Sequence, residues 1–248
     1  MGLRRGNAAT WLDPQSPDAA TTAILAERRH WLQQNPQRHA LFSNAAAPLV
    51  TATAAWLSSA ARHPFDASLE SLGTQWTPDF LLLHPDEHGE FCLVGGSVCF
   101  PSSWAPEEKL GLPLTSIHSV VPGLTAEIGA RIQTFLGRLP PHEVFERDNW
   151  SLSATSERNL HPALKRPPLG PDTPLTSTFL RVERQAFVRL PNTTGLLFLI
   201  QIELQRLSEL TADLELRRTF KAHFASMSDS VASYKGLAAA RPSLLREL

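Results

Sequence analysis

The chain has 248 residues, and its 23 basic and 24 acidic side chains give a formal net charge of −1. A charge so close to zero, with the two signs interspersed, provides no field that would attract nucleic acid or an anionic membrane surface. The length and an apolar fraction of 42% are sufficient for one sizeable core. We therefore expect a folded protein whose partners are neither nucleic acid nor membrane.

Targeting and redox signals are sparse. The longest apolar run, GLLFLI at residues 195–200, is far shorter than a bilayer span, and the first residues lack the apolar segment of a secretory signal. The two cysteines, Cys92 and Cys99, form neither a Cys-x-x-Cys pair nor a Cys-x-x-Cys-His motif for covalent haem attachment. These features predict a cytoplasmic protein in which both cysteines are small buried side chains.

The first part of the chain is expected to be helical. Apolar residues recur at helical spacing in residues 18–34, and residues 49–61 are rich in alanine with Trp56 and Leu57 on one stripe. Both segments read as amphipathic helices. We assign residues 1–75 to a helical N-terminal cap.

Strand patterns begin after Pro78. Residues 80–83 and 91–94 are short apolar runs on either side of a turn-like segment, so they predict a β-hairpin, which residues 97–100 extend. Helical patterns follow at residues 105–110 and 124–139, the latter with apolar positions that include Ile128.

Three further strands are expected at residues 143–152, 179–190 and 195–204, followed by a charged helix at residues 204–223. The proline-rich residues 161–174 predict a long loop beside a cavity. The fold class is thus α+β, an antiparallel sheet with helices packed on one face. Its core would span residues 76–205, and residues 206–248 would form a C-terminal helix and a weak helix or tail.

Five short motifs carry a resemblance. They are MGLRR at residues 1–5, VGGSVCFPSSW at 94–104, SIHSVVPG at 116–123, RDNW at 147–150 and LRVERQ at 180–185. Together they resemble the haem-dependent oxidative N-demethylase-like family, over most of the chain as far as about residue 215. The resemblance implies a PAS-like fold, which agrees with the order of strand, strand, helices and three strands.

The same resemblance implies a function. A non-covalently held haem b would use O2 to remove a methyl group from a small secondary or tertiary amine. Reducing equivalents would come from separate flavin and iron–sulfur subunits, because this chain has no Gly-x-Gly-x-x-Gly motif and too few cysteines for a cluster.

Two histidines compete as the iron ligand. His118 has apolar neighbours and precedes a helix, where a neutral imidazole could meet a cofactor, although a lone histidine is more often structural. His161 opens the proline-rich loop and is expected to face solvent. With the resemblance we predict that His118 is the axial ligand and His161 is not. His84 and His88, in the hairpin turn, are discounted as metal ligands.

A charged cluster marks the strand at residues 179–190. Strand alternation places Arg181 and Glu183 on one face and Arg184 on the other. A buried Arg–Glu pair is one interpretation, because such a pair can be a structural brace. The resemblance supports the other, in which Arg181 and Glu183 are catalytic: the guanidinium donates to bound O2, and the carboxylate holds the amine or moves protons.

Other residues could complete a haem pocket. Trp150 and Phe179, with Trp104, could line a flat cofactor, and Arg147, with Lys165 or Arg166, could meet the propionates. Ordinary core packing and solvated surface charges are the competing interpretations for these residues.

Two other kinds of function stay open. A haem-based gas or redox sensor would need an output element, for which the C-terminal helix of a homodimer is a candidate. A haem-free small-molecule-binding module would purify without colour. Phosphate-loop, Gly-x-Ser-x-Gly and His-Glu-x-x-His motifs are absent from the sequence, which argues against common nucleotide-binding, hydrolase and zinc-protease functions.

Overall fold

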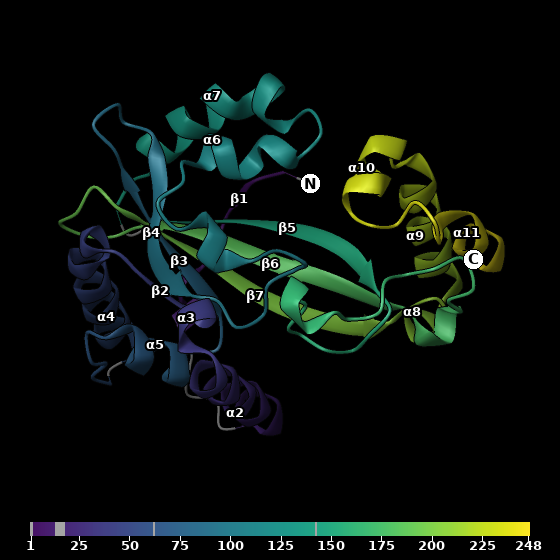
Figure 1. Ribbon diagram of the computed structural model, residues 1–248, viewed down its shortest axis with the longest axis horizontal. Coiled ribbons are helices and arrows are strands. Elements are labelled where there is room, and N and C mark those ends of the chain that lie inside the picture. Colours follow the sequence, from purple (N-terminus) through teal and green to yellow (C-terminus); the bar gives the residue numbers. More distant parts are fainter. Residues whose placement is uncertain (1, 13–17, 62, 142) are drawn as a thin grey trace.

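A computed structural model describes residues 2–12, 18–61, 63–141 and 143–248. Within these residues, seven strands form an antiparallel sheet in the order β1-β5-β6-β7-β3-β4-β2, with helices around it (Figure 1). The α+β class expected from the sequence is confirmed.

Five strands make the centre of the sheet, and they follow the expected PAS-like chain order. They are β3 (Asp79–Pro85), β4 (Phe91–Ser97), β5 (Val144–Ser153), β6 (Phe179–Arg189) and β7 (Leu196–Arg206). Two short strands from the first part of the chain were not expected. The first, β1 (Arg4–Arg5), pairs with β5, and the second, β2 (Ala40–Phe42), pairs with β4. The N-terminal segment therefore supplies both edges of the sheet as well as helices.

The helices fall into three groups along the chain. Before the central strands come α1 (Ala8–Leu12), α2 (Ala19–Gln34), α3 (Pro36–His39), α4 (Ala47–Ala61) and α5 (Leu69–Gln75). Between β4 and β5 lie α6 (Leu114–Ile117), the 3-10 turn His118–Val120 and α7 (Leu124–Gly137), where the side chain of Ile128 is outside the described residues. The last group is α8 (Leu207–Leu210), α9 (Leu214–Ser226), α10 (Asp229–Tyr234) and α11 (Arg241–Glu247). No helix in the described part of the chain is long and apolar enough to span a membrane.

Helices cover both faces of the sheet rather than the one face expected. Leu82 and Leu199 pack against α4 and α5 in one core, whereas Leu81 and Ile200 belong to a second core with α6 and α7. Both faces are covered because the strands are apolar on both sides. Ala186 and Phe187, for example, are consecutive in β6, and each contributes apolar surface to a different face. A sheet that is apolar on both faces must be covered on both.

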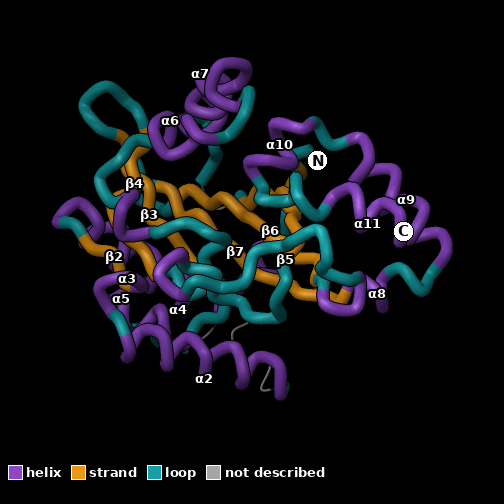
Figure 2. Tube along the Cα trace, turned by 45° about the vertical axis from the view of Figure 1, so that its right-hand side comes forward, coloured by secondary structure: helices purple, strands orange, loops and turns teal. Residues whose placement is uncertain are grey.

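The C-terminal region is a packed unit. Its core includes Phe224, Leu237, Ala240 and Leu244, all 0% exposed, and it lies at the end of β5 and β6 (Figure 2). The helix expected at residues 204–223 is interrupted, because β7 continues to Arg206 and a new helix begins after Asp213, whose carboxylate accepts hydrogen bonds from the first turn of α9. The expected weak helix or tail is the pair α10 and α11.

A buried ion pair joins α2 to the sheet. Nη1 of Arg28 lies 2.5 Å from Oδ1 of Asp79, and the two side chains are 0% and 1% exposed. The guanidinium also donates to the carbonyl of Gly73 and to the hydroxyl of Ser97. Desolvating two charges is costly, so these additional hydrogen bonds are what make the pair tolerable in the interior.

The same carboxylate anchors the chain after β4. The backbone amide of Cys99 donates to Oδ1 of Asp79 at 2.7 Å, and that of Phe100 donates to Oδ2 at 2.8 Å. Burial raises the pKa of the Cys99 thiol to about 12, so this cysteine is a packed, unreactive side chain. Asp79 therefore fixes the segment from which Ser102 reaches the sheet.

We predict that Arg28→Met destabilises the protein by about 3 to 5 kcal/mol, because it leaves the Asp79 carboxylate buried without its cation. Denaturant unfolding measures the change. Arg29→Met is the matched control, since Arg29 is the next residue of α2 and is exposed; it should shift stability by less than about 0.5 kcal/mol. Equal effects of the two substitutions would contradict the role of the ion pair.

Candidate functional site

Polar side chains gather on one face of β5 and β6. The antiparallel register pairs Arg147 with Gln185, Asn149 with Glu183 and Ser151 with Arg181. Directly paired residues point to the same face, so these six side chains share the face that α6 and α7 cover farther along the strands. Arg184 points the other way and forms an ion pair with Glu203 at 3.3 Å.

Glu183 lies at the centre of this group. Its Oε2 accepts hydrogen bonds from Nε2 of Gln185 at 2.8 Å and from Nδ2 of Asn149 at 3.2 Å. Its Oε1 accepts from the hydroxyl of Ser102. All three donors are neutral, so the carboxylate is held in one orientation without a direct salt bridge.

Arg181 is 0% exposed and reaches Glu183 only through Ser102. Its Nε donates to the Ser102 hydroxyl and its Nη2 to the carbonyl of Phe100, both at 2.8 Å. Burial lowers the pKa of Arg181 to about 10, with Glu183 acting in the opposite direction. Its Nη1 is buried and has no hydrogen-bond partner among the described residues. This donor can therefore serve a ligand.

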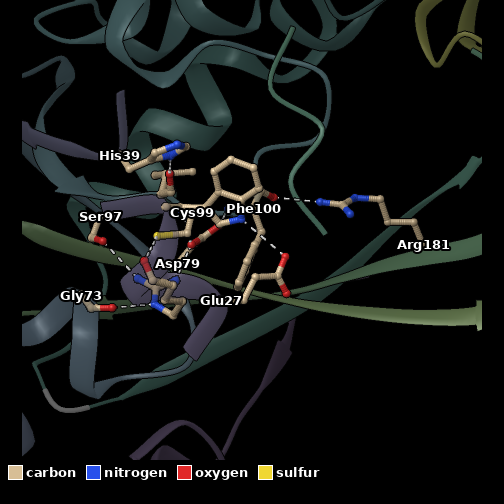
Figure 3. Close-up of polar contacts among 11 residues, drawn as sticks. Glu27, His39, Gly73, Asp79, Ser97, Cys99, Phe100 and Arg181 are labelled. Atoms are coloured by element: carbon tan, nitrogen blue, oxygen red, sulfur yellow. Dashed lines mark hydrogen bonds and ion pairs between the residues drawn. The ribbon is translucent and has the colours of Figure 1, made fainter. Parts of the chain in front are cut away.

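A continuous chain of contacts joins this site to the ion pair of Arg28 and Asp79. Figure 3 shows the link, with the amide of Phe100 on Asp79 and its carbonyl on Arg181. One residue thus connects the two buried arginines. The position of Arg181 depends on the anchored segment at residues 99–102 as well as on β6.

His118 lies close enough to Arg147 for the two charges to interact. Burial, and then the positive charge of Arg147, lower the pKa of His118 below its usual 6.5. No hydrogen bond joins the His118 ring to another described residue, and Nε of Arg147 is a buried donor without a described partner. Burial and the charge of Arg147 both favour the neutral form of the imidazole, which is the form that can ligate a metal.

An aromatic surface continues this face toward α7. Phe187 stacks on Phe198 with ring centroids 4.6 Å apart, and Phe135 meets Phe145 edge to face at 5.4 Å. These rings and Ile117, the residue before His118, are only partly buried. Apolar surface of this kind suits a flat hydrophobic ligand.

His161 is buried, which corrects the expectation that it faces solvent. It is 4% exposed, its Nε2 lies 3.1 Å from the Glu107 carboxylate, and its Nδ1 accepts a hydrogen bond from the amide of Ala163. Both nitrogens are thus engaged. The proline-rich loop carries this histidine inward, because Leu160 also binds the carbonyl of Pro101.

A recess of about 250 Å³ lies beside His161, away from Glu183 and His118. It is lined by His30, Trp31, Gln34, Asn35, Arg38, His39, His161 and Leu164. The described residues contain no group of three histidine, cysteine or acidic side chains placed to hold a metal ion.

The remaining residues suggested by the sequence are dispersed. Trp150 packs on Phe220 and Phe224 of α9 and points to the face opposite Glu183. Phe179 lies at the far end of β6 beneath the guanidinium of Arg206. Lys165 is exposed and Arg166 pairs with Glu157, whereas Trp104 packs against the second core. His84 contacts Thr194 and His88 is exposed.

Sequence reasoning missed two residues that approach the site from α10. Lys235 contacts Asn149, and the negative charge of Glu183 acts on both Tyr234 and Lys235. Both lie in a stretch rich in alanine and serine that gives no strong periodic signal. The local sequence signal for the end of this helix is a glycine followed by a hydrophobic residue, Gly236 and Leu237, and Leu237 is buried.

A comparison with known protein families covers nearly the whole chain. The model of a family described as haem-dependent oxidative N-demethylase, alpha subunit-like, matches residues 13–245. The chain belongs to this family. The match includes every strand except β1, the residues around Glu183 and most of the C-terminal helices. The family name indicates haem dependence, and its words alpha subunit point to an enzyme of several subunits.

This N-demethylase-like chain has side chains of the chemical kinds that would hold a haem group. Such a cofactor needs a neutral imidazole, apolar surface and cationic partners for its propionates. His118 could provide the imidazole, the phenylalanines of β5, β6 and β7 could provide the apolar surface, and Nε of Arg147, which has no described partner, could donate to a propionate.

We predict that His118→Ala abolishes the Soret band of protein loaded with haem, whereas His161→Ala retains it. Acidification should weaken haem binding, because a proton competes for the imidazole. Because the pKa of His118 is lowered, this loss should set in at a lower pH than it would for an imidazole with the usual pKa of 6.5. Visible titrations measure both effects, and an unchanged His118→Ala spectrum would refute the assignment.

Proposed function

We propose that this chain is the haem-binding subunit of an oxidative N-demethylase, which uses haem b and O2 to remove a methyl group from a small secondary or tertiary amine. The observation that carries the proposal is the environment of Glu183. A carboxylate held by three neutral donors lies on the same sheet face as Arg147, and the positive charge of Arg147 in turn favours the neutral form of His118. Membership of the family supports the cofactor and the reaction class.

His118 would ligate the iron, and Arg147 would pair with a propionate. When bound, haem supplies the activation of O2. The partly buried phenylalanines of the second core would keep water away from a bound cofactor. Trp150 and Phe179 have no part in this arrangement, because one lies on the opposite face and the other is engaged with Arg206.

Glu183 binds the substrate as an ammonium ion. An ionised carboxylate offers roughly four acceptor positions, and Ser102, Asn149 and Gln185 occupy three of them. One position is left for an N–H group, which suits a protonated tertiary amine with its single N–H. The same carboxylate can take this proton when the amine nitrogen must become neutral before its methyl group is oxidised.

Arg181 orders the other side of the site. Its Nε–H donates to the Ser102 hydroxyl, so the hydroxyl proton is directed at Glu183. Its Nη1, which has no hydrogen-bond partner among the described residues, is the donor that we assign to the O2 substrate. The reducing equivalents enter from separate electron-transfer subunits, a partnership that the alpha-subunit name of the family supports.

The first test is spectroscopic and catalytic. Protein reconstituted with haem should show a stoichiometric Soret band and, with an electron donor, should form formaldehyde from N-methylated amines under O2. Absence of haem binding by the wild-type protein would refute the proposal.

We predict that Glu183→Gln lowers kcat/KM for the amine by about 10- to 100-fold, the loss expected for a hydrogen bond to a charged group, while haem content is unchanged. Formaldehyde release and the Soret absorbance measure the two quantities. Glu203→Gln is the control, because Glu203 is exposed on β7 and pairs with Arg184 away from the site. Full amine turnover by Glu183→Gln would exclude the carboxylate as the amine site.

A further inference from the structure

The C-terminal end of α10 fixes the position of Lys235. At the end of α10 the amide of Gly236 donates to the carbonyl of Ser233, and the amide of Leu237 donates to that of Ala232. This pair of bonds is a Schellman motif, and Gly236 has the left-handed conformation, φ 69°, that it requires. Ala232 and Leu237 are both buried, and Leu237 belongs to the C-terminal core. The turn that carries Lys235 is therefore held in place at both ends.

Lys235 extends from this turn over the edge of β5. Its Nζ donates to Oδ1 of Asn149 at 2.9 Å and to the backbone carbonyl of Trp150, and it lies 5.8 Å from the centroid of the Trp150 ring. The strand edge is free here, because β1 pairs with β5 only at Phe145 and Glu146. The lysine thus occupies an edge that no strand covers in the described part of the sheet.

These contacts determine which way the Asn149 amide points. An ammonium group can only donate hydrogen bonds and an ionised carboxylate can only accept them. Asn149 lies between the two, with its oxygen toward Lys235 and its nitrogen 3.2 Å from Oε2 of Glu183. If the amide were rotated by 180°, its nitrogen would face the ammonium group of Lys235, a second donor, and its oxygen would face the carboxylate of Glu183, a second acceptor. Only the observed orientation is therefore stable.

We propose that Lys235 is a positioning residue for the amine site, acting through Asn149. The inference rests on the proposed role of Glu183 and names the residue that keeps its carboxylate aligned. Lys235 holds the Asn149 amide as a donor, and this donor, with those of Ser102 and Gln185, leaves a single acceptor position on Glu183 for the substrate. The C-terminal helices are thereby part of the active site, although none of their residues touches the amine.

The functional test compares three variants in the haem-loaded, full-length protein. Lys235→Met should raise KM for the amine about tenfold with a small change in kcat, because a ground-state contact loses its alignment. Lys235→Arg keeps a cationic donor and should recover most of the affinity. Lys221→Met is the matched control, since Lys221 is an exposed lysine of the adjoining helix α9. Equal KM values for Lys235→Met and Lys221→Met would overturn the proposal.

A second measurement does not depend on catalysis. Hydrogen exchange of the Asn149 side-chain amide, assigned in NMR spectra by its loss in Asn149→Asp, should be slow in the wild-type protein and at least tenfold faster in Lys235→Met. Unchanged exchange overturns the positioning role, whatever the protein binds. If the wild type instead fails to bind haem or amine, the proposed function fails while this exchange test still decides the role of Lys235.

Should Lys235→Met not fold, Asn149→Asp breaks the same connection from its other end. Aspartate still accepts from Lys235, but once ionised it cannot donate to Glu183. The expected result is again a KM increase of about tenfold or more, with haem content unchanged. A wild-type KM in Asn149→Asp would overturn the proposal.

Discussion

The Asp79 carboxylate is the interaction on which the rest of the structure depends. It is the acceptor for a guanidinium from α2 and for two backbone amides beyond β4, so three parts of the chain meet at one buried charge. Removing a charged partner from such a pair costs far more than the intact pair contributes. The network therefore holds the segment bearing Phe100 and Ser102 in one position relative to the sheet. Arg181, and through it Glu183, take their positions from that segment.

Much of the architecture could be predicted from local sequence patterns. The five central strands were located to within a few residues, because alternating or continuous apolar runs end at turn-forming residues on both sides. The distribution of helices was not deduced, since a search for single-faced amphipathic strands overlooks pairs such as Ala186 and Phe187, which are apolar on opposite faces. The short edge strands β1 and β2 carry too few residues for any periodicity to be visible.

The site was less accessible from sequence. Alternation alone placed Arg181 and Glu183 on one face and Arg184 on the other, and the register of β6 agrees. The partners of these residues could not be deduced, because Ser102 is 81 positions from Glu183 and Lys235 is 86 from Asn149. The burial of His161 was missed for a related reason: a proline-rich segment indicates irregular backbone and says nothing about which way that backbone turns.

The position of Lys235 after the whole sheet in the chain has a consequence for the order of folding. Every strand is complete once residue 206 has been made, whereas α10 follows only after α8 and α9. Because no described strand lies after residue 206, the chain order allows a period in which the sheet is assembled and the edge of β5 is bare. During that period Asn149 has no cation to orient it. The carboxylate that we propose as the amine site is therefore the last part of the site to be aligned, by a helix that lies outside the sheet.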